Sequence, residues 1–165
     1  MRRLSIGLGL LLIGACSLSA AEAIPETKEG LQQQMSTLMS MLKAGHKEHS
    51  DTLLKVLVLP NQEDWFKKNF GPELGATMAQ QYGAKQADLP QEVGALLAKA
   101  QSSDVVTDVC SKGSDATATG LQKKALEALK NPVSLYTAKV GGMSLWSFVY
   151  VDGAFHLIGK LPALK

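Results

Sequence analysis

The sequence predicts an α+β fold, in which N-terminal helices pack on a C-terminal antiparallel sheet that ends in a three-stranded meander. Apolar residues recur at helical spacing through residues 24–101, and after Ser102 the period changes to two. Three apolar segments then end the chain, joined by Gly141-Gly142 and Asp152-Gly153, pairs that are typical of two-residue hairpin turns. Helices that precede strands, rather than alternate with them, indicate the α+β class.

A secretory signal is predicted at residues 1–23, ahead of a single α+β domain at residues 24–165. Two arginines precede an apolar run from Leu4 to Ile13, and the small-residue stretch that follows ends in Ala21-Glu22-Ala23, which suits cleavage by signal peptidase. The apolar run is too short for a membrane anchor, because a spanning helix needs about 20 apolar residues. We therefore expect an exported protein, periplasmic or secreted, that begins at Ile24.

A second processing route would end in a lipid anchor. Ile13-Gly14-Ala15-Cys16 resembles the bacterial lipoprotein motif, whose cysteine receives a diacylglycerol and becomes the new N-terminus. On this route the protein is anchored in the cell envelope through Cys16, and only then does it contact the membrane. We favour the soluble route because isoleucine and glycine are unusual at the first two positions of the motif.

The composition of the mature chain excludes a nucleic-acid partner. Loss of the signal leaves 142 of the 165 residues, with 15 basic and 14 acidic side chains of the original 17 and 15. The resulting charge of +1 and the lack of a clustered Lys/Arg face provide no electrostatic surface for phosphates. Cys110 has no cysteine partner within the mature domain of the soluble form.

Residues 28–44 are predicted to form the first helix. Its apolar side chains recur three or four positions apart, so they share one face that we expect to be buried in the core, and Gly45 is placed to end the helix. The stripe consists of Leu31, Met35, Leu38, Met39 and Leu42.

Residues 52–59 are apolar nearly all round and stop at Pro60, so periodicity leaves open whether they form a short helix or a strand. We favour a helix with Ser50 or Asp51 as its N-cap.

Glycine and proline bound the next three predicted helices. Asn61 is expected to cap a short helix that Gly71 ends, Pro72 opens a helix that runs to about Lys85, and Pro90 opens another. The apolar residues at helical spacing in the last two are Leu74, Met78, Tyr82, Val93, Leu96, Leu97 and Ala100.

Strands dominate the rest of the chain. Residues 105–110 alternate with period two, and one more helix is predicted at 121–129. Strands follow at 133–140, 143–151 and 154–161. Two-residue turns place Val140 opposite Met143, and Val151 opposite Ala154.

This register predicts two different faces for the sheet. One is large and apolar, and we expect it to be the face that the helices cover. It consists of Val133, Leu135, Trp146, Phe148, Tyr150, Phe155 and Leu157. The other is half polar and consists of Ser134, Tyr136, Ala138, Leu145, Ser147, Val149, His156, Ile158 and Lys160.

The half-polar face contains the weak candidates for ligand contact, His156, Tyr136 and Ser147. The register sets Tyr136 opposite Ser147 and His156 opposite Val149, so three side chains able to form hydrogen bonds lie close together. The alternative is an ordinary exposed sheet face. We favour that alternative because no carboxylate is placed to orient the imidazole.

No catalytic residue, metal site or cofactor is predicted. His46 and His49 are three residues apart, but a zinc site needs a third or fourth ligand. Cys110 lies in an alternating strand, where a small hydrophobic role is expected. Glu63 and Asp64 are adjacent, so on a helix their side chains diverge.

The closing segment and the early Trp65-Phe66 resemble the nuclear-transport-factor-2-like or SnoaL-like proteins. The segment in question is Trp146-Ser147-Phe148-Val149-Tyr150-Val151-Asp152-Gly153-Ala154-Phe155. The resemblance implies a cone in which helices pack into a curved sheet. This chain departs from the family by showing four clear strands where about six are usual, and the family contains both enzymes and binding modules, so the fold alone does not decide function.

The sequence favours a ligand-binding or protein-binding accessory module over an enzyme. Its expected partner is a small molecule or an envelope protein, and a homodimer is left open. One alternative is a small-molecule hydrolase or isomerase with a pocket between helices and sheet. The other is a lipid-anchored envelope protein.

We expect the mature protein to lack residues 1–23, or to begin at a lipidated Cys16, because of the signal described above. Mass spectrometry of the N-terminus of protein recovered from its native host distinguishes the two products. Recovery of an uncleaved chain beginning at Met1 from the cytoplasm would contradict both.

Overall fold

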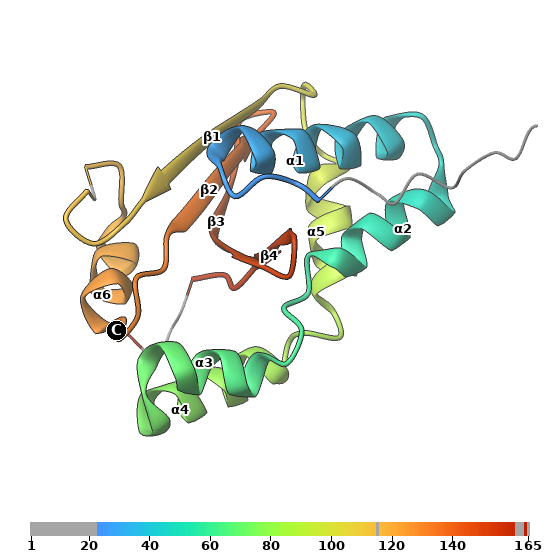
Figure 1. Cartoon of the computed structure of the whole chain (residues 1–165). Helices are drawn as coiled ribbons and strands as arrows, with labels where there is room; N and C mark the ends of the chain where they lie inside the picture. The colour runs from blue at the N-terminus through green and yellow to red at the C-terminus, as the bar shows by residue number, and fades with distance from the viewer. Residues whose placement is uncertain (1–22, 115, 161–163, 165) are drawn as a thin grey trace, which may run out of the picture.

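The computed structural model describes residues 23–114, 116–160 and 164, so the predicted signal, with Cys16, lies outside the described residues except for Ala23. The described residues form six helices and one antiparallel sheet of four strands, which confirms the α+β prediction (Figure 1). In chain order the elements are α1 Lys28–Lys43, α2 Lys47–Val56, α3 Gln62–Phe70, α4 Pro72–Gly83, α5 Leu89–Leu97, β1 Val105–Cys110, α6 Gly120–Ala128, β2 Leu135–Val140, β3 Met143–Val151 and β4 Ala154–Leu157.

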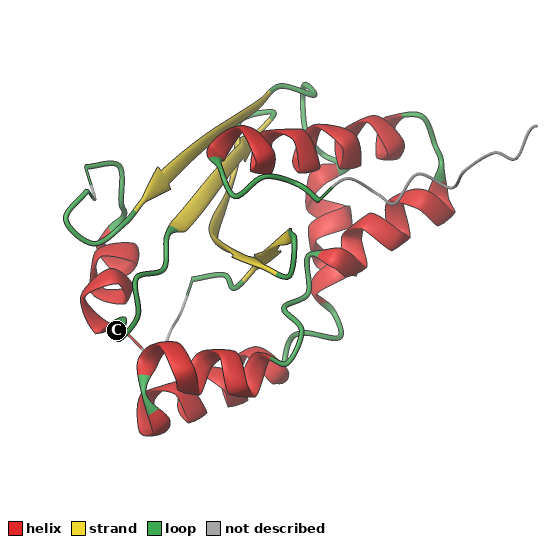
Figure 2. Cartoon of the chain, in the orientation of Figure 1, coloured by secondary structure: helices red, strands yellow, loops and turns green. Residues whose placement is uncertain are grey.

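Both faces of the sheet are covered, so the expectation of one buried and one accessible face is wrong. The strands are ordered β1-β2-β3-β4. Helices α1, α2 and α5 contribute to one core cluster with residues of β1–β4, and α3, α4 and α6 contribute to a second. Figure 2 shows the α1/α2 pair and the α3/α4 pair on opposite sides of the short strand β4.

Helix α1 forms as its sequence predicts. The hydroxyl of Thr27 accepts a hydrogen bond from the backbone N–H of Gly30, which caps the first turn. The helix ends just before Gly45, whose φ of +73° is a conformation that glycine adopts without strain. The apolar stripe faces the first core cluster, with Leu31 and Met35 fully buried.

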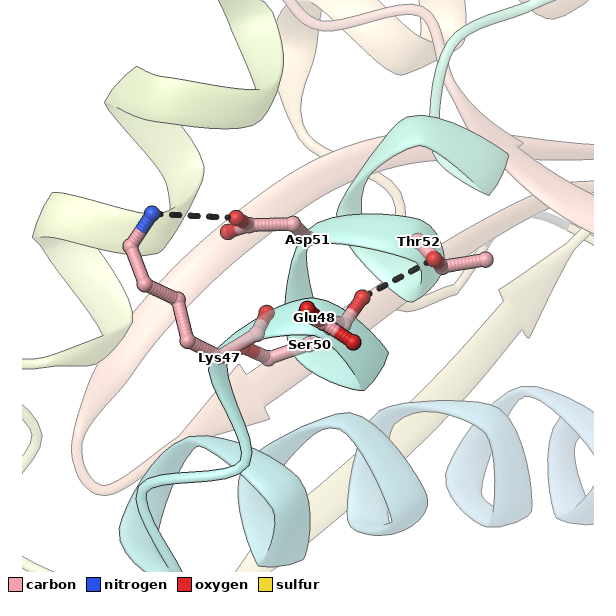
Figure 3. Close-up of polar contacts among 5 residues, drawn as sticks. All are labelled: Lys47, Glu48, Ser50, Asp51 and Thr52. Atoms are coloured by element: carbon pink, nitrogen blue, oxygen red, sulfur yellow. Dashed lines mark hydrogen bonds and ion pairs between the residues drawn. The ribbon is translucent and has the colours of Figure 1, made fainter.

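Helix α2 begins earlier than expected, so the N-cap assignment to Ser50 or Asp51 is wrong. Both residues lie inside the helix: the Ser50 hydroxyl donates to the carbonyl of Lys47, and the Asp51 carboxylate lies 3.3 Å from the Lys47 ammonium (Figure 3). Residues 47–49 are polar because they are exposed, not because they precede the helix. The ambiguous residues 52–59 are helical up to Val56.

Helix α3 ends at Gly71 and α4 begins at Pro72, as the sequence predicts, and the two helices pack as a tight hairpin. Asn61 precedes α3 with a φ of +45°, but its side chain forms no capping bond, so it contributes a left-handed backbone rather than a cap. Gly75 permits the close approach of the two helices, because a Cβ there would lie 2.5 Å from the Cα of Lys67.

The two hairpin turns and their register are confirmed, but a β-bulge changes the sheet beyond them. Val140 pairs with Met143 and Val151 with Ala154, as expected. Between Thr137 and Tyr136 the register shifts by one residue, so Tyr136 pairs with Phe148 rather than with Ser147. Ser147 is the inserted residue and has a φ of +61°.

The bulge redistributes the predicted faces. Tyr136 joins Phe148, Tyr150 and Phe155 in the first core cluster, whereas Leu135 belongs to the second. Other members of the supposedly half-polar face are also buried. They are Ala138, Leu145, Val149 and Ile158.

Strand β4 is shorter than the predicted 154–161 and is sealed at its outer edge. The side-chain amide of Gln34 donates to the carbonyl of Phe155 at 2.8 Å and accepts from its N–H at 2.9 Å. The N–H of Leu157 donates to the carbonyl of Leu57 at 2.8 Å. The edge is therefore paired by α1 and by the segment after α2 instead of by another strand.

We expect Phe148→Ala to lower the free energy of unfolding by about 3 to 5 kcal/mol, because the ring is fully buried and its removal leaves a cavity. Chemical denaturation measures the change. Val106→Ala is the control, since Val106 is 58% exposed and should cost far less. Equal losses in the two variants would contradict the assigned faces.

We expect Gln34→Met to cost about 2 to 4 kcal/mol of unfolding free energy, because a side chain of similar length leaves both backbone groups of Phe155 without a partner. The exposed neighbour Gln33→Met is the matched control and should be nearly neutral. Similar stability of the two variants would show that the seal contributes little.

Candidate functional site

A cavity of about 690 Å³ lies between α4, the turn into α5, the start of α6 and the chain that follows β4. Its walls are mostly apolar, and several of the wall residues belong to the second core cluster. Cavities of this size and character are the usual form of small-molecule sites. The apolar lining consists of Phe66, Met78, Tyr82, Leu89, Leu121 and Ile158. We call this space the Tyr82 cavity.

Local sequence places these side chains. Met78 and Tyr82 are four apart and therefore share a face of α4, which packs on α3 across Gly75. Leu89 is the first residue of α5 and Leu121 lies in the first turn of α6, so both sit where their helices begin. With Phe66 of α3 and Ile158 after β4, five separate parts of the chain thus meet around one space.

Tyr82 is the buried polar group of this wall. Its hydroxyl oxygen accepts a hydrogen bond of 2.7 Å from the backbone N–H of Leu59, and the residue is only 8% exposed. Burial raises the pKa of Tyr82, and the bond from Leu59 opposes that rise only in part. The phenol is therefore neutral at physiological pH.

Charged groups lie at the rim of the Tyr82 cavity. Lys85 follows α4, Lys160 follows β4 and Glu92 lies in α5, and all three are exposed. None of them takes part in the ion pairs found among the described residues, which join Lys28 to Glu29, Lys47 to Asp51, and Lys67 to Glu63. The rim is thus polar and accessible, and the interior is apolar.

A groove of similar volume, about 680 Å³, lies between α2 and α5. Two of its charged side chains, Lys47 and Asp51, pair with each other within α2 (Figure 3). An i,i+4 pair of this kind stabilises the helix itself. Lys55 is the one charged lining residue of the groove outside this pair, whereas the rim of the Tyr82 cavity has three unpaired charged groups.

A smaller hollow of about 470 Å³ lies at the start of α3. Glu63 and Asp64 line it, so it is a poor site for an anion even though it adjoins a helix N-terminus. The buried Oε1 atom of Gln62 has no hydrogen-bond partner among the described residues.

The structure buries His156, Tyr136 and Ser147, and none of the three lines the Tyr82 cavity. The ring nitrogens of His156 lie 3.0 Å from the carbonyl of Val58 and 3.1 Å from that of Val151. The expectation that they share an accessible face is therefore wrong, since the bulge and the second helical layer were not visible in the pattern. Their role in ligand contact stays a prediction.

The hydroxyl of Tyr136 donates to the carbonyl of Glu26 at 3.4 Å, and the carbonyl of Ser147 accepts from the N–H of Ile158 at 2.9 Å. Burial, with a smaller contribution from the charge of Glu26, raises the pKa of Tyr136. The first contact joins β2 to the segment that precedes α1, and the second joins β3 to the chain after β4.

Within the part of the chain that the structure describes, no three His, Cys, Asp or Glu side chains are grouped to hold a metal ion. The rings of His46 and His49 lie 6.2 Å apart on the surface. Cys110 is buried, and its thiol donates to the carbonyl of Leu135 at 3.4 Å.

Sequence reasoning assigned Met78 and Tyr82 to a helical stripe, which is right, but could not show that their face borders a cavity. A helical period identifies an inward-facing residue and is silent about how completely its neighbours fill the space. The sequence did contain one indication of a polar group in this wall, namely a tyrosine at a core position, because a buried hydroxyl needs a hydrogen-bond partner.

Comparison with protein-family models, characterised proteins and solved structures finds no significant match to this chain. The resemblance to the nuclear-transport-factor-2-like proteins is therefore an untested expectation. None of the helices in the described ranges is both long enough and apolar enough to span a bilayer.

We expect the free energy of unfolding to fall as the pH rises above about 10, the ordinary pKa of a phenol. Tyr82 and Tyr136 keep their protons in the folded chain after the unfolded chain has lost them, so the unfolded state is favoured at high pH. Urea denaturation between pH 9 and pH 11 measures the slope. The double variant Tyr82→Phe/Tyr136→Phe should show a smaller slope than the wild type, and an unchanged slope would contradict the assignment.

Proposed function

We propose that this chain is an exported module that binds a small molecule in the Tyr82 cavity without transforming it. The observation that carries the proposal is an apolar cavity, of a size suited to a small ligand, whose walls come from five parts of the chain and whose rim is polar. Export follows from the predicted signal at residues 1–23.

The groups around the cavity favour binding over catalysis. Hydrolysis or isomerisation of a small molecule needs an acid or base held against the reacting atom. The titratable lining residues are Tyr82, Lys85, Glu92 and Lys160, and the last three are exposed at the rim. Tyr82 is held neutral in the interior and already accepts a backbone hydrogen bond. Among the described residues, no side-chain hydrogen bond or ion pair joins two of these four groups.

The scaffold around the cavity is held by specific contacts, which favours a preformed site. The bond from Leu59 to Tyr82 ties α4 to the segment after α2. The N–H of Lys130 donates to the carbonyl of Asn69, and the Asn131 side chain donates to that of Lys68. These bonds fix the segment after α6 to α3, and Phe66 of α3 lines the cavity.

We expect the neutral fluorophore N-phenyl-1-naphthylamine to bind the wild-type protein saturably, with one site per chain. Leu121→Trp should weaken that binding at least about tenfold, because the indole occupies the cavity and displaces most of the apolar contact. Fluorescence titration measures the affinity, and circular dichroism confirms that the variant folds.

Leu96→Trp is the matched control, because Leu96 is 37% exposed and does not line the cavity. The control should bind the fluorophore as the wild type does. A wild-type protein without saturable binding, or equal binding by both tryptophan variants, would overturn the proposal.

A further inference from the structure

We infer that the ligand of the Tyr82 cavity is a monoanionic amphiphile, with an apolar body inside the cavity and one carboxylate-like head at the rim. This inference rests on the proposed function and adds the chemical class of the ligand. It follows from the distribution of apolar and charged groups around the cavity.

The interior selects an apolar body. The six apolar lining residues come from α3, α4, α5, α6 and the chain after β4, so they surround the space rather than form one flat patch. Transfer of hydrocarbon from water to such surroundings is favourable in proportion to the area buried. A fully polar ligand would lose its hydration there without replacement.

The rim selects a negative head. Lys85 and Lys160 reach it from two segments that are 75 positions apart in the sequence, and Glu92 is the one acidic residue of the described lining. The two ammonium groups have no partner within ion-pair distance among the described residues. A cationic head would meet two like charges and one opposite charge, whereas an anionic head would meet two opposite charges and one like charge.

Hydrogen-bond donors near the rim suit a carboxylate as well. The amides of Gln81 and Gln86 line the cavity beside Lys85. Charged acceptors form stronger hydrogen bonds than neutral ones do.

The other hollows have a different character. The groove between α2 and α5 contains Lys47 and Asp51, which pair with each other, and the hollow at the start of α3 is acidic. The groove keeps one unpaired ammonium group, that of Lys55, whereas the Tyr82 cavity has two, those of Lys85 and Lys160, beside an apolar interior.

Three probes with the same chain test the inference: dodecanoate, 1-dodecanol and dodecyltrimethylammonium, each below the concentration at which it aggregates. Displacement of N-phenyl-1-naphthylamine measures their affinities. We expect dodecanoate to bind roughly fivefold tighter than the alcohol and the cation to bind most weakly, since each exposed charge pair changes affinity by a few-fold. The advantage of dodecanoate should shrink as salt is raised.

The double variant Lys85→Gln/Lys160→Gln should lose the preference for dodecanoate and keep its affinity for 1-dodecanol. Lys43→Gln is the control, because Lys43 is an exposed lysine at the end of α1 that does not line the cavity. Equal affinities for the anion and the alcohol, or a preference that survives in the double variant, would overturn the inference while leaving the proposed function standing. Failure of every probe, the fluorophore included, would overturn both.

Discussion

The outer edge of β4 must find hydrogen-bond partners outside the sheet, and much of the structure depends on how it does so. The side-chain amide of Gln34 forms hydrogen bonds with both the N–H and the carbonyl of Phe155. The carbonyl of Leu57 accepts a hydrogen bond from the N–H of Leu157. An edge strand left open costs stability where it is buried and invites aggregation where it is exposed. Here the Gln34 side chain of α1 and the Leu57 carbonyl form the hydrogen bonds that a neighbouring strand would otherwise form.

This seal also connects the edge of the sheet to the cavity. The carbonyl of Leu57 accepts from β4, and two residues further on the N–H of Leu59 donates to the hydroxyl of Tyr82. A short chain of hydrogen bonds therefore runs from β4 to α4. It holds the wall of the cavity at a fixed distance from the sheet, and this explains how a site can lie beside the core without collapsing into it.

The bulge at Ser147 determines which side chains of the sheet face which of the two core clusters. One inserted residue reverses the facing of every side chain beyond it, so Tyr136 packs with the α1 layer and Leu135 with the α6 layer. A sheet apolar on both faces needs helices on both, and the chain supplies α1, α2 and α5 for one and α3, α4 and α6 for the other. The Tyr82 cavity lies at the border of the second core, where packing gives way to a polar rim.

The sequence by itself determined the features that depend on neighbouring residues. The α1 stripe, the break at Gly71-Pro72 and both hairpin turns follow from side-chain period and from backbone preferences of glycine and proline, and each was predicted at its place. The start of α2 was misplaced, because polar residues on an exposed helix face look like residues before a helix. The outer ends of β2 and β4 were also predicted too long.

Tertiary structure decided what depends on residues far apart in the chain. The bulge at Ser147, the pairing of Gln34 with Phe155 across 121 positions and the meeting of Lys85 with Lys160 leave no mark in any local window. A period of two predicts that side chains alternate between the faces of a strand, but it does not show where a bulge shifts the register. A helical period predicts which face of a helix is buried, but it does not show whether that face packs against other residues or borders a cavity. Cavities and edge seals arise from the fit between elements, which only the folded arrangement fixes.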